Sequence, residues 1–175
     1  MKLHVLFLCI VLSPACFGQT EIKANKKDTT LARILIPEKP TGWVSDFENI
    51  FTQEECFILD SLINSHELNY TNEVAIVTLT LDSILITTSE EFDNFSLTLF
   101  KKWGIGKKEK NNGIWILIST NLRKIRIDTG TGLTGKLTKE EAKKIIDTII
   151  IPEFKNDEFY LGVLYGLQAI LKEIE

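Results

Sequence analysis

Histidine and cysteine are scarce in this sequence, and most of them lie close to the N-terminus. The chain of 175 residues has two histidines and three cysteines, and beyond residue 18 only Cys56 and His66 remain. This scarcity excludes an internal disulfide beyond residue 18, and it argues against a histidine-rich zinc site or a serine–histidine–aspartate triad. Cys56 lies in an apolar helical pattern, which indicates a buried structural thiol. We expect His66 at the surface near a helix end.

The common nucleotide-binding signatures are missing or incomplete. No Gly-Lys-Ser or Gly-Lys-Thr of a P-loop occurs. The letters GTGLTG at 130–135 satisfy the pattern Gly-x-Gly-x-x-Gly, but the strand expected before them belongs to a hairpin, and the helix after them does not lead to a second strand. The net charge of −4 at pH 7 argues against nucleic acid as a partner. Nucleotide binding and nucleic-acid binding are therefore not favoured.

Long apolar runs are absent except at the N-terminus. Residues 1–18 carry an early lysine, an apolar run at 3–12 and small residues before Gly18, which is typical of a secretory signal peptide and too short for a membrane span. An alternative is a lipoprotein anchored through Cys16. Residues 19–36 are expected to form an N-terminal tail and residues 37–175 one domain. We therefore expect an exported protein, periplasmic or extracellular, with no transmembrane segment in the mature chain.

Hydrophobic spacing and capping residues predict a mixture of helices and strands. Helices are expected at about 52–68, 89–103, 138–152 and 157–174, with Pro152 ending the third. Strands are expected at 73–81, 113–119 and 124–128, the last two joined as a hairpin, and residues 42–52 are expected to form a short acidic loop. This order indicates an α/β fold, a three-layer α/β/α sandwich whose small mixed sheet contains a β-hairpin.

Two acidic residues lie beside segments that could carry chemistry. Asp128 stands at the mouth of a loop with three glycines, and Asp46 lies between two aromatic residues of the 42–52 segment. Carboxylates and loop carbonyls are the ligands that Ca²⁺ prefers, whereas a simple tight turn would need the glycines for a positive φ or for close packing of the backbone. If the loops converge, Asp46 and Asp128 share one glycine-lined hollow, where a cation or a proton must lie between them. Both interpretations of the glycine loop stay open at this point.

Four segments, in this order, resemble the TPM domain family over about residues 37–171. They are PEKPTGWVSDF, WGIGKK followed by NNGI, RKIRIDTGTGLTG, and IPEFKNDEFYLGV. The resemblance implies an α/β/α sandwich in an exported or lumenal protein, with weak acid phosphatase activity in plant members and divalent-cation binding in some bacterial ones. It places Asp46 and Asp128 as catalytic residues and metal ligands. The residues that it assigns to loops and ligand binding are Gly104, Gly106, Gly113, Gly130, Gly132 and Gly135.

Departures from the family pattern weaken the expected cation site. Thr134 and Lys139 stand where the family usually has acidic residues, and Thr131 replaces a usual tyrosine. Because ligand charge sets the affinity of a Ca²⁺ site, Ca²⁺ or Mg²⁺ binding should be weaker here. Two functions remain as hypotheses. The first is an envelope protein that is at best a weak acid phosphatase, and the second is a catalytically inactive module that assists a membrane-protein partner.

Overall fold

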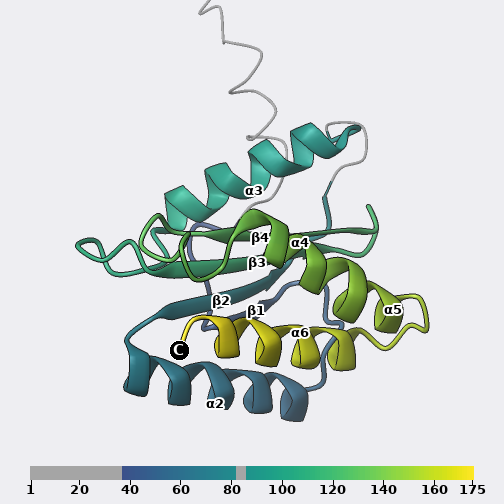
Figure 1. Cartoon of the computed structure of the whole chain (residues 1–175). Coiled ribbons are helices and arrows are strands. Elements are labelled where there is room, and N and C mark those ends of the chain that lie inside the picture. The colour runs from purple at the N-terminus through teal and green to yellow at the C-terminus, as the bar shows by residue number, and fades with distance from the viewer. Residues whose placement is uncertain (1–36, 82–85) are drawn as a thin grey trace, which may run out of the picture.

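A four-stranded mixed sheet lies between helices on both of its faces (Figure 1). The computed structural model describes residues 37–81 and 86–175. The strands lie in the order β1 (Val44–Asp46), β2 (Glu73–Thr78), β3 (Gly113–Ser119) and β4 (Lys124–Thr129). The helical segments are α2 (Gln53–Tyr70), α3 (Ser89–Trp103), α4 (Lys139–Ile145), the π-helical η1 (Ile146–Ile150), α5 (Ile151–Phe154) and α6 (Phe159–Glu173). Helix α3 covers one face, and α2 and α6 cover the other, so the predicted three-layer α/β fold is confirmed.

The sheet has two buried central strands and two edge strands. β1, β2 and β3 are parallel, and β4 returns antiparallel to β3, so the predicted hairpin is present. All seven residues of β3 are buried, as a continuous apolar strand covered on both faces requires. The loop expected at 42–52 is partly wrong, because Val44–Asp46 pairs with β2 as a short edge strand. Three residues are too few for the local pattern to reveal a strand.

A side chain of α2 occupies a backbone hydrogen-bonding position on the outer side of β1. The Val44 N–H donates to the Asp60 carboxylate over 2.9 Å. Burial raises the pKa of Asp60, and this hydrogen bond partly offsets the effect. The edge of the sheet at β1 is thus short and already partly paired with a side chain.

Side chains of alternating strand positions form one apolar core on each face. On the α2 and α6 face, Val74, Ile76 and Ile116 pack with Leu59 and Leu167 in a single cluster. On the α3 face the cluster is smaller; its central members are Ala75, Val77, Trp115, Leu117, Phe92, Phe95 and Leu99. Successive residues of a strand point to opposite faces of the sheet, so they belong alternately to the two clusters. The face on which a polar strand residue lies therefore follows from its position in the strand.

The third predicted helix does not stop at Pro152. After α4 the chain passes through the π-helical turn η1 and continues into α5, with Pro152 near the start of α5. The π-helical turn before Pro152 departs from the α-helical hydrogen-bond pattern, since the Ile151 N–H bonds to Ile146 O five residues back, and Pro152 itself has no N–H to pair. Ile150, at the end of η1, packs against Gly166 of α6, where an added Cβ would lie 2.6 Å from the Ile150 side chain.

None of the helices in residues 37–81 and 86–175 has both the length and the apolar character needed to cross a membrane. The expected signal peptide, the lipidation alternative at Cys16 and the tail at 19–36 lie outside the described residues.

The helix caps support a prediction about acid stability. Helix α3 begins with a capping box in which the Glu91 carboxylate accepts hydrogen bonds from the backbone of Thr87 and Thr88 and from the Thr87 hydroxyl. These bonds lower the pKa of Glu91 to about 2. The ionised form therefore stabilises the folded protein above the ordinary pKa of a glutamate, and this contribution is lost as the pH falls toward 2. In Glu91→Gln, we expect the urea unfolding midpoint to fall less between pH 5 and pH 3 than it does in the wild type. Urea titrations of both proteins at both pH values measure this difference.

Glu90→Gln is the matched control for this prediction. It removes the same charge from the same first turn of α3 and leaves the capping box intact. We expect it to keep the wild-type pH dependence. If the urea unfolding midpoint fell equally in both variants between pH 5 and pH 3, the role given to Glu91 would be contradicted.

Candidate functional site

Asp46 closes the turn that follows β1. One carboxylate oxygen accepts the Phe51 N–H over 2.9 Å, and the other accepts the hydroxyl of Thr78 at the end of β2. The same hydroxyl accepts the Glu48 N–H over 2.9 Å. Both carboxylate oxygens of Asp46 thus have donors, and these contacts fix the connection between β1 and α2.

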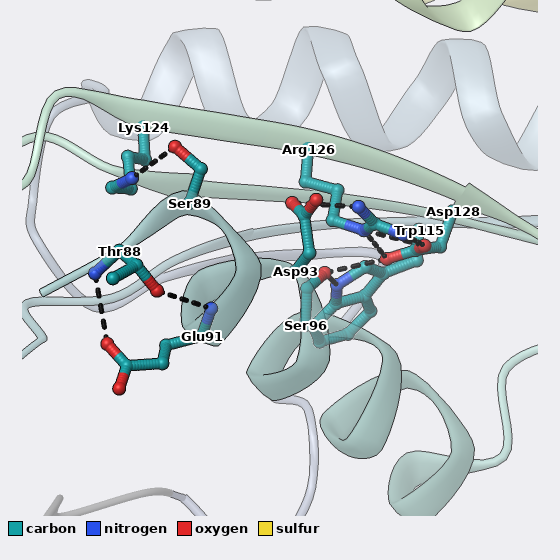
Figure 2. A network of polar contacts seen from close by, with 9 residues as sticks. All are labelled: Thr88, Ser89, Glu91, Asp93, Ser96, Trp115, Lys124, Arg126 and Asp128. Atoms are coloured by element: carbon teal, nitrogen blue, oxygen red, sulfur yellow. Dashed lines mark hydrogen bonds and ion pairs between the residues drawn. The ribbon is translucent and has the colours of Figure 1, made fainter. Parts of the chain in front are cut away.

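Asp128 lies at the centre of a polar network on the α3 face of the sheet (Figure 2). Its side chain is 6% exposed, and it accepts the Ser96 hydroxyl over 2.7 Å. Arg126 contacts it through Nε at 2.8 Å and through a second guanidinium nitrogen at 2.8 Å. The Trp115 indole N–H donates to the Ser96 hydroxyl over 3.1 Å, and Asp93 accepts from Arg126 at 2.7 Å.

The network leaves Arg126 firmly charged. Burial alone would lower its pKa, but the charges of Asp128 and Asp93 and the hydrogen bonds that they accept outweigh burial, so the pKa of Arg126 is raised. Arg126 holds the Asp128 side chain in place through a two-point contact. This aspartate connects β4 to α3 through Ser96.

The structure does not bring Asp46 and Asp128 together. Asp46 is on β1 and Asp128 is on β4, the two opposite edges of the sheet. Asp46 shares its face with Val44, which packs in the α2 and α6 core, whereas Asp128 contacts α3 on the other face. The expected hollow shared by these two carboxylates is therefore wrong, because strand order separates two loops that the sequence suggested would meet.

The donors around these aspartates do not fit a shared divalent cation. A Ca²⁺ site needs six to eight oxygens, several of them free carboxylate oxygens. The carboxylate oxygens of Asp46 and Asp128 already accept hydrogen bonds from protein donors. The described residues also contain no group of three or more His, Cys, Asp or Glu side chains that could hold a metal ion. Whether either residue acts alone in catalysis or binding stays a prediction.

Four of the six assigned glycines allow two loops to pack backbone against backbone. A Cβ on Gly130 would lie 2.1 Å from the Asn111 carbonyl oxygen, and one on Gly132 would lie 2.0 Å from the Lys110 carbonyl oxygen. Within the 104–113 connection, a Cβ on Gly106 would lie 2.4 Å from the Gly113 nitrogen, and one on Gly113 would lie 2.1 Å from the Ile105 carbonyl oxygen. Hydrogen bonds join the loops, including Gly130 N–H to Gly113 O at 2.8 Å. The close packing of the loops accounts for these four glycines.

The other two assigned glycines have different surroundings. Gly104 ends α3 in the left-handed conformation, with φ of 65°. Gly135 has nothing within 4 Å of an added Cβ. Near it, the Thr134 hydroxyl donates to the Thr131 carbonyl oxygen over 3.1 Å, within the same loop.

His66 is not at the surface, contrary to expectation. It is 6% exposed and stacks on Tyr70, with the ring centroids 4.6 Å apart. Burial lowers the pKa of His66; Glu175 opposes this effect and Lys136 adds to it. Its burial follows from the C-terminal residues, because the Asn72 side chain beside it donates to the Ile174 carbonyl oxygen over 3.0 Å. A contact between residues 102 positions apart has no local sequence signal.

Sequence reasoning missed a groove along the outer edge of β4. One cavity of about 450 Å³ lies between α3, β4 and the α4–η1 segment, and a second of about 570 Å³ continues it toward α5. They share the lining residues Arg123, Lys124, Ile125 and Ile151. Lys139, which departs from the family pattern, lines the first cavity. The alternation of KIRI in β4 and the basic residues of α4 were the available signals, but only the fold places them side by side.

A family model and several solved structures match this chain, and three of these structures are described below. The model described as a TPM domain matches residues 44–173. The N-terminal domain of a protein from P. gingivalis has 25% identity and a TM-score of 0.67, with 76% of this chain and 82% of that one covered. The BA42 protein of the psychrophilic bacterium Bizionia argentinensis has 17% identity and a TM-score of 0.60, with 73% and 83% covered. An N-terminal domain from Corynebacterium glutamicum has 11% identity and a TM-score of 0.56, with 81% and 85% covered.

The last two likenesses, at less than 25% identity, show the fold alone. No curated protein matches the chain.

Proposed function

The chain belongs to the TPM domain family, and on that premise we propose that it is an exported module of the cell envelope that binds a partner protein and does not hydrolyse phosphomonoesters. Export is supported by the signal-like residues 1–18. The partner is proposed to be an envelope or membrane protein.

The surroundings of Asp128 are the main support for a binding role. A catalytic carboxylate, or one that holds a metal ion, needs an oxygen free to face the substrate or the ion. Asp128 is buried, and its carboxylate oxygens accept hydrogen bonds from Arg126 and Ser96. Asp46, the other candidate, is on the far edge of the sheet and closes a turn. These contacts favour structural roles for both residues and a function that needs no catalytic carboxylate pair.

Turnover of para-nitrophenyl phosphate tests this proposal against the phosphatase hypothesis. We expect the wild type, Asp46→Asn and Asp128→Asn to release nitrophenol at the rate of a buffer blank, with and without Ca²⁺ or Mg²⁺. We also expect the melting temperature to be the same with and without either metal, because a ligand that binds the folded state raises it by mass action. Turnover that falls about tenfold, or 1.4 kcal/mol in activation free energy, in either variant would overturn the proposal.

The binding role has its own positive test. Crosslinking of the full chain in its source cells should recover a complex with one envelope or membrane protein, identified by mass spectrometry. The same complex must form from the two purified proteins. Recovery of the chain without any partner under conditions that crosslink a known envelope complex would contradict the proposal.

A further inference from the structure

The outer edge of β4 presents unpaired backbone groups. Antiparallel strands bond through every second residue, and the Gly130 N–H bonds to Gly113 O at 2.8 Å. With the register of β3 and β4, this alternation directs the backbone groups of Arg126 and Asp128 toward β3. The N–H and C=O groups of Ile125 and Ile127 therefore point away from the sheet. Within the described residues, no strand pairs with β4 on that side.

Helices flank the outer edge of β4, and an open groove remains between them and the strand. Phe92 and Asp93 of α3 line one side of the first cavity, and Ala142 and Ile146 of the α4–η1 segment line the other. Both cavities include Ile125, whose backbone groups face outward. The groove is thus open along the strand and has apolar side chains in its walls. An extended segment laid in it would meet backbone groups along one side and side-chain pockets on the others.

The groove carries an excess of positive charge, although the chain as a whole is acidic. Six of its lining residues are cationic, and three are acidic. Asp93 is paired with Arg126, and Asp147 is paired with Lys143. The cations that have no acidic partner within 4 Å among the described residues are Arg123, Lys124, Lys139 and Lys155.

We propose that the β4-edge groove binds an extended acidic segment of a partner protein, which adds to the sheet as a fifth strand beside β4. The inference rests on the proposed function and identifies the site and the chemistry of the partner. The open backbone groups of Ile125 and Ile127 select a peptide over a free anion, because only a peptide supplies matching N–H and C=O groups. The unpaired cations select acidic side chains. A second copy of this chain fits less well, since two β4 edges would bring like charges together.

A peptide-binding experiment with the full chain tests this inference. The probe is a fluorescein-labelled eight-residue peptide of alternating valine and glutamate, followed by fluorescence anisotropy. We expect saturable binding, and we expect amide hydrogen exchange of Ile125 and Ile127 to slow when the peptide is bound. A peptide with the same sequence and N-methyl groups on alternate amides should bind about tenfold more weakly, equivalent to 1.4 kcal/mol. So should a peptide with lysine in place of glutamate.

Charge reversal in the protein supplies a matched pair of variants. Lys139→Glu combined with Lys155→Glu changes two exposed side chains of the groove and should weaken binding about tenfold. A glutamate at position 139 suits the first turn of α4, so this variant should fold. Lys108→Glu, on an exposed loop residue that lines neither cavity, should bind the peptide as the wild type does.

Each other outcome has a distinct meaning. Binding that N-methylation does not affect, or that an equal concentration of inorganic phosphate removes, would overturn strand addition. Tighter binding to vesicles of anionic lipid than to the peptide would overturn a peptide partner. Absence of peptide binding at about 1 mM in a protein that shows no phosphatase turnover would overturn this inference and leave the proposed function standing. Turnover that depends on Asp46 or Asp128 would overturn the proposed function instead.

Discussion

Replacing Gly130 by alanine is expected to lower the free energy of unfolding by about 3 kcal/mol. The new methyl carbon would lie 2.1 Å from the Asn111 carbonyl oxygen, and that neighbour is backbone rather than a flexible side chain. The loops cannot easily separate, because Gly130 N–H bonds to Gly113 O and Gly132 N–H bonds to Asn111 O. The variant must therefore break these hydrogen bonds or strain both loops. Urea unfolding followed by tryptophan fluorescence measures the loss.

Gly135→Ala is the matched control for this change. It lies in the same loop, and an added Cβ there meets nothing within 4 Å. We expect its unfolding free energy to stay within about 0.5 kcal/mol of the wild type. A similar loss at both positions would show that the loop needs glycine for backbone freedom and not for close packing. A loss at Gly130 that added Ca²⁺ restores would show instead that the loop is a cation site.

Truncating Asp128 to alanine is expected to cost about 3 kcal/mol of stability, because it leaves a partly buried cation and a buried hydroxyl without their acceptor. The expected loss is at the lower end of the range for broken buried ion pairs. Arg126 keeps its contact with Asp93, and its side chain is 25% exposed. The Ser96 hydroxyl and the Trp115 indole behind it lose their link to β4. Thermal and urea unfolding of the variant give the measurement.

Two further variants identify the cause of this loss. Asp147→Ala removes an exposed carboxylate from the pair with Lys143 on the α4–η1 segment, and it should cost no more than about 0.5 kcal/mol. Arg126→Met combined with Asp128→Ala should be more stable than Asp128→Ala alone, because it also removes the cation that has lost its buried acceptor. An unchanged melting temperature in Asp128→Ala would mean that this carboxylate is not held for stability and would return it to the catalytic candidates.

Local sequence signals predicted most of the helices and the central strands. The expected caps Thr52 and Thr138 each form a capping box with a glutamate three residues later and begin a helix in the structure. Thr88 forms a third such box at the start of α3, which was expected from its hydrophobic spacing. The runs at 113–119 and 124–128 predicted β3 and most of β4. These signals are short-range, since a cap or a hairpin is decided within a few residues. The β2 prediction was three residues too long, because the apolar pattern continues past the last paired residue, Thr78.

Features that depend on strand order or on distant contacts were not predictable in the same way. Nothing in the segments around Asp46 and Asp128 reveals that they lie on opposite edges of the sheet. His66 is buried by C-terminal residues more than a hundred positions away. Close packing of the glycine loops was one of two open interpretations, and the contact with residues 110–113 accounts for it. The β4-edge groove combines residues from α3, β4 and α4–η1, so it exists only after folding.

The unequal edges of the sheet limit how far it can grow. A fibre built by strand pairing needs two edges that accept each other, so that every added molecule offers a new end. Here β1 is three residues long, and its Val44 N–H is taken by Asp60, while β4 is lined by cations that repel a second β4. Neither edge strand can pair with the same strand of a second molecule, and the short β1 has few free backbone groups to pair with β4. Stacking of identical molecules into a continuous cross-β ribbon is therefore blocked at both ends of the sheet.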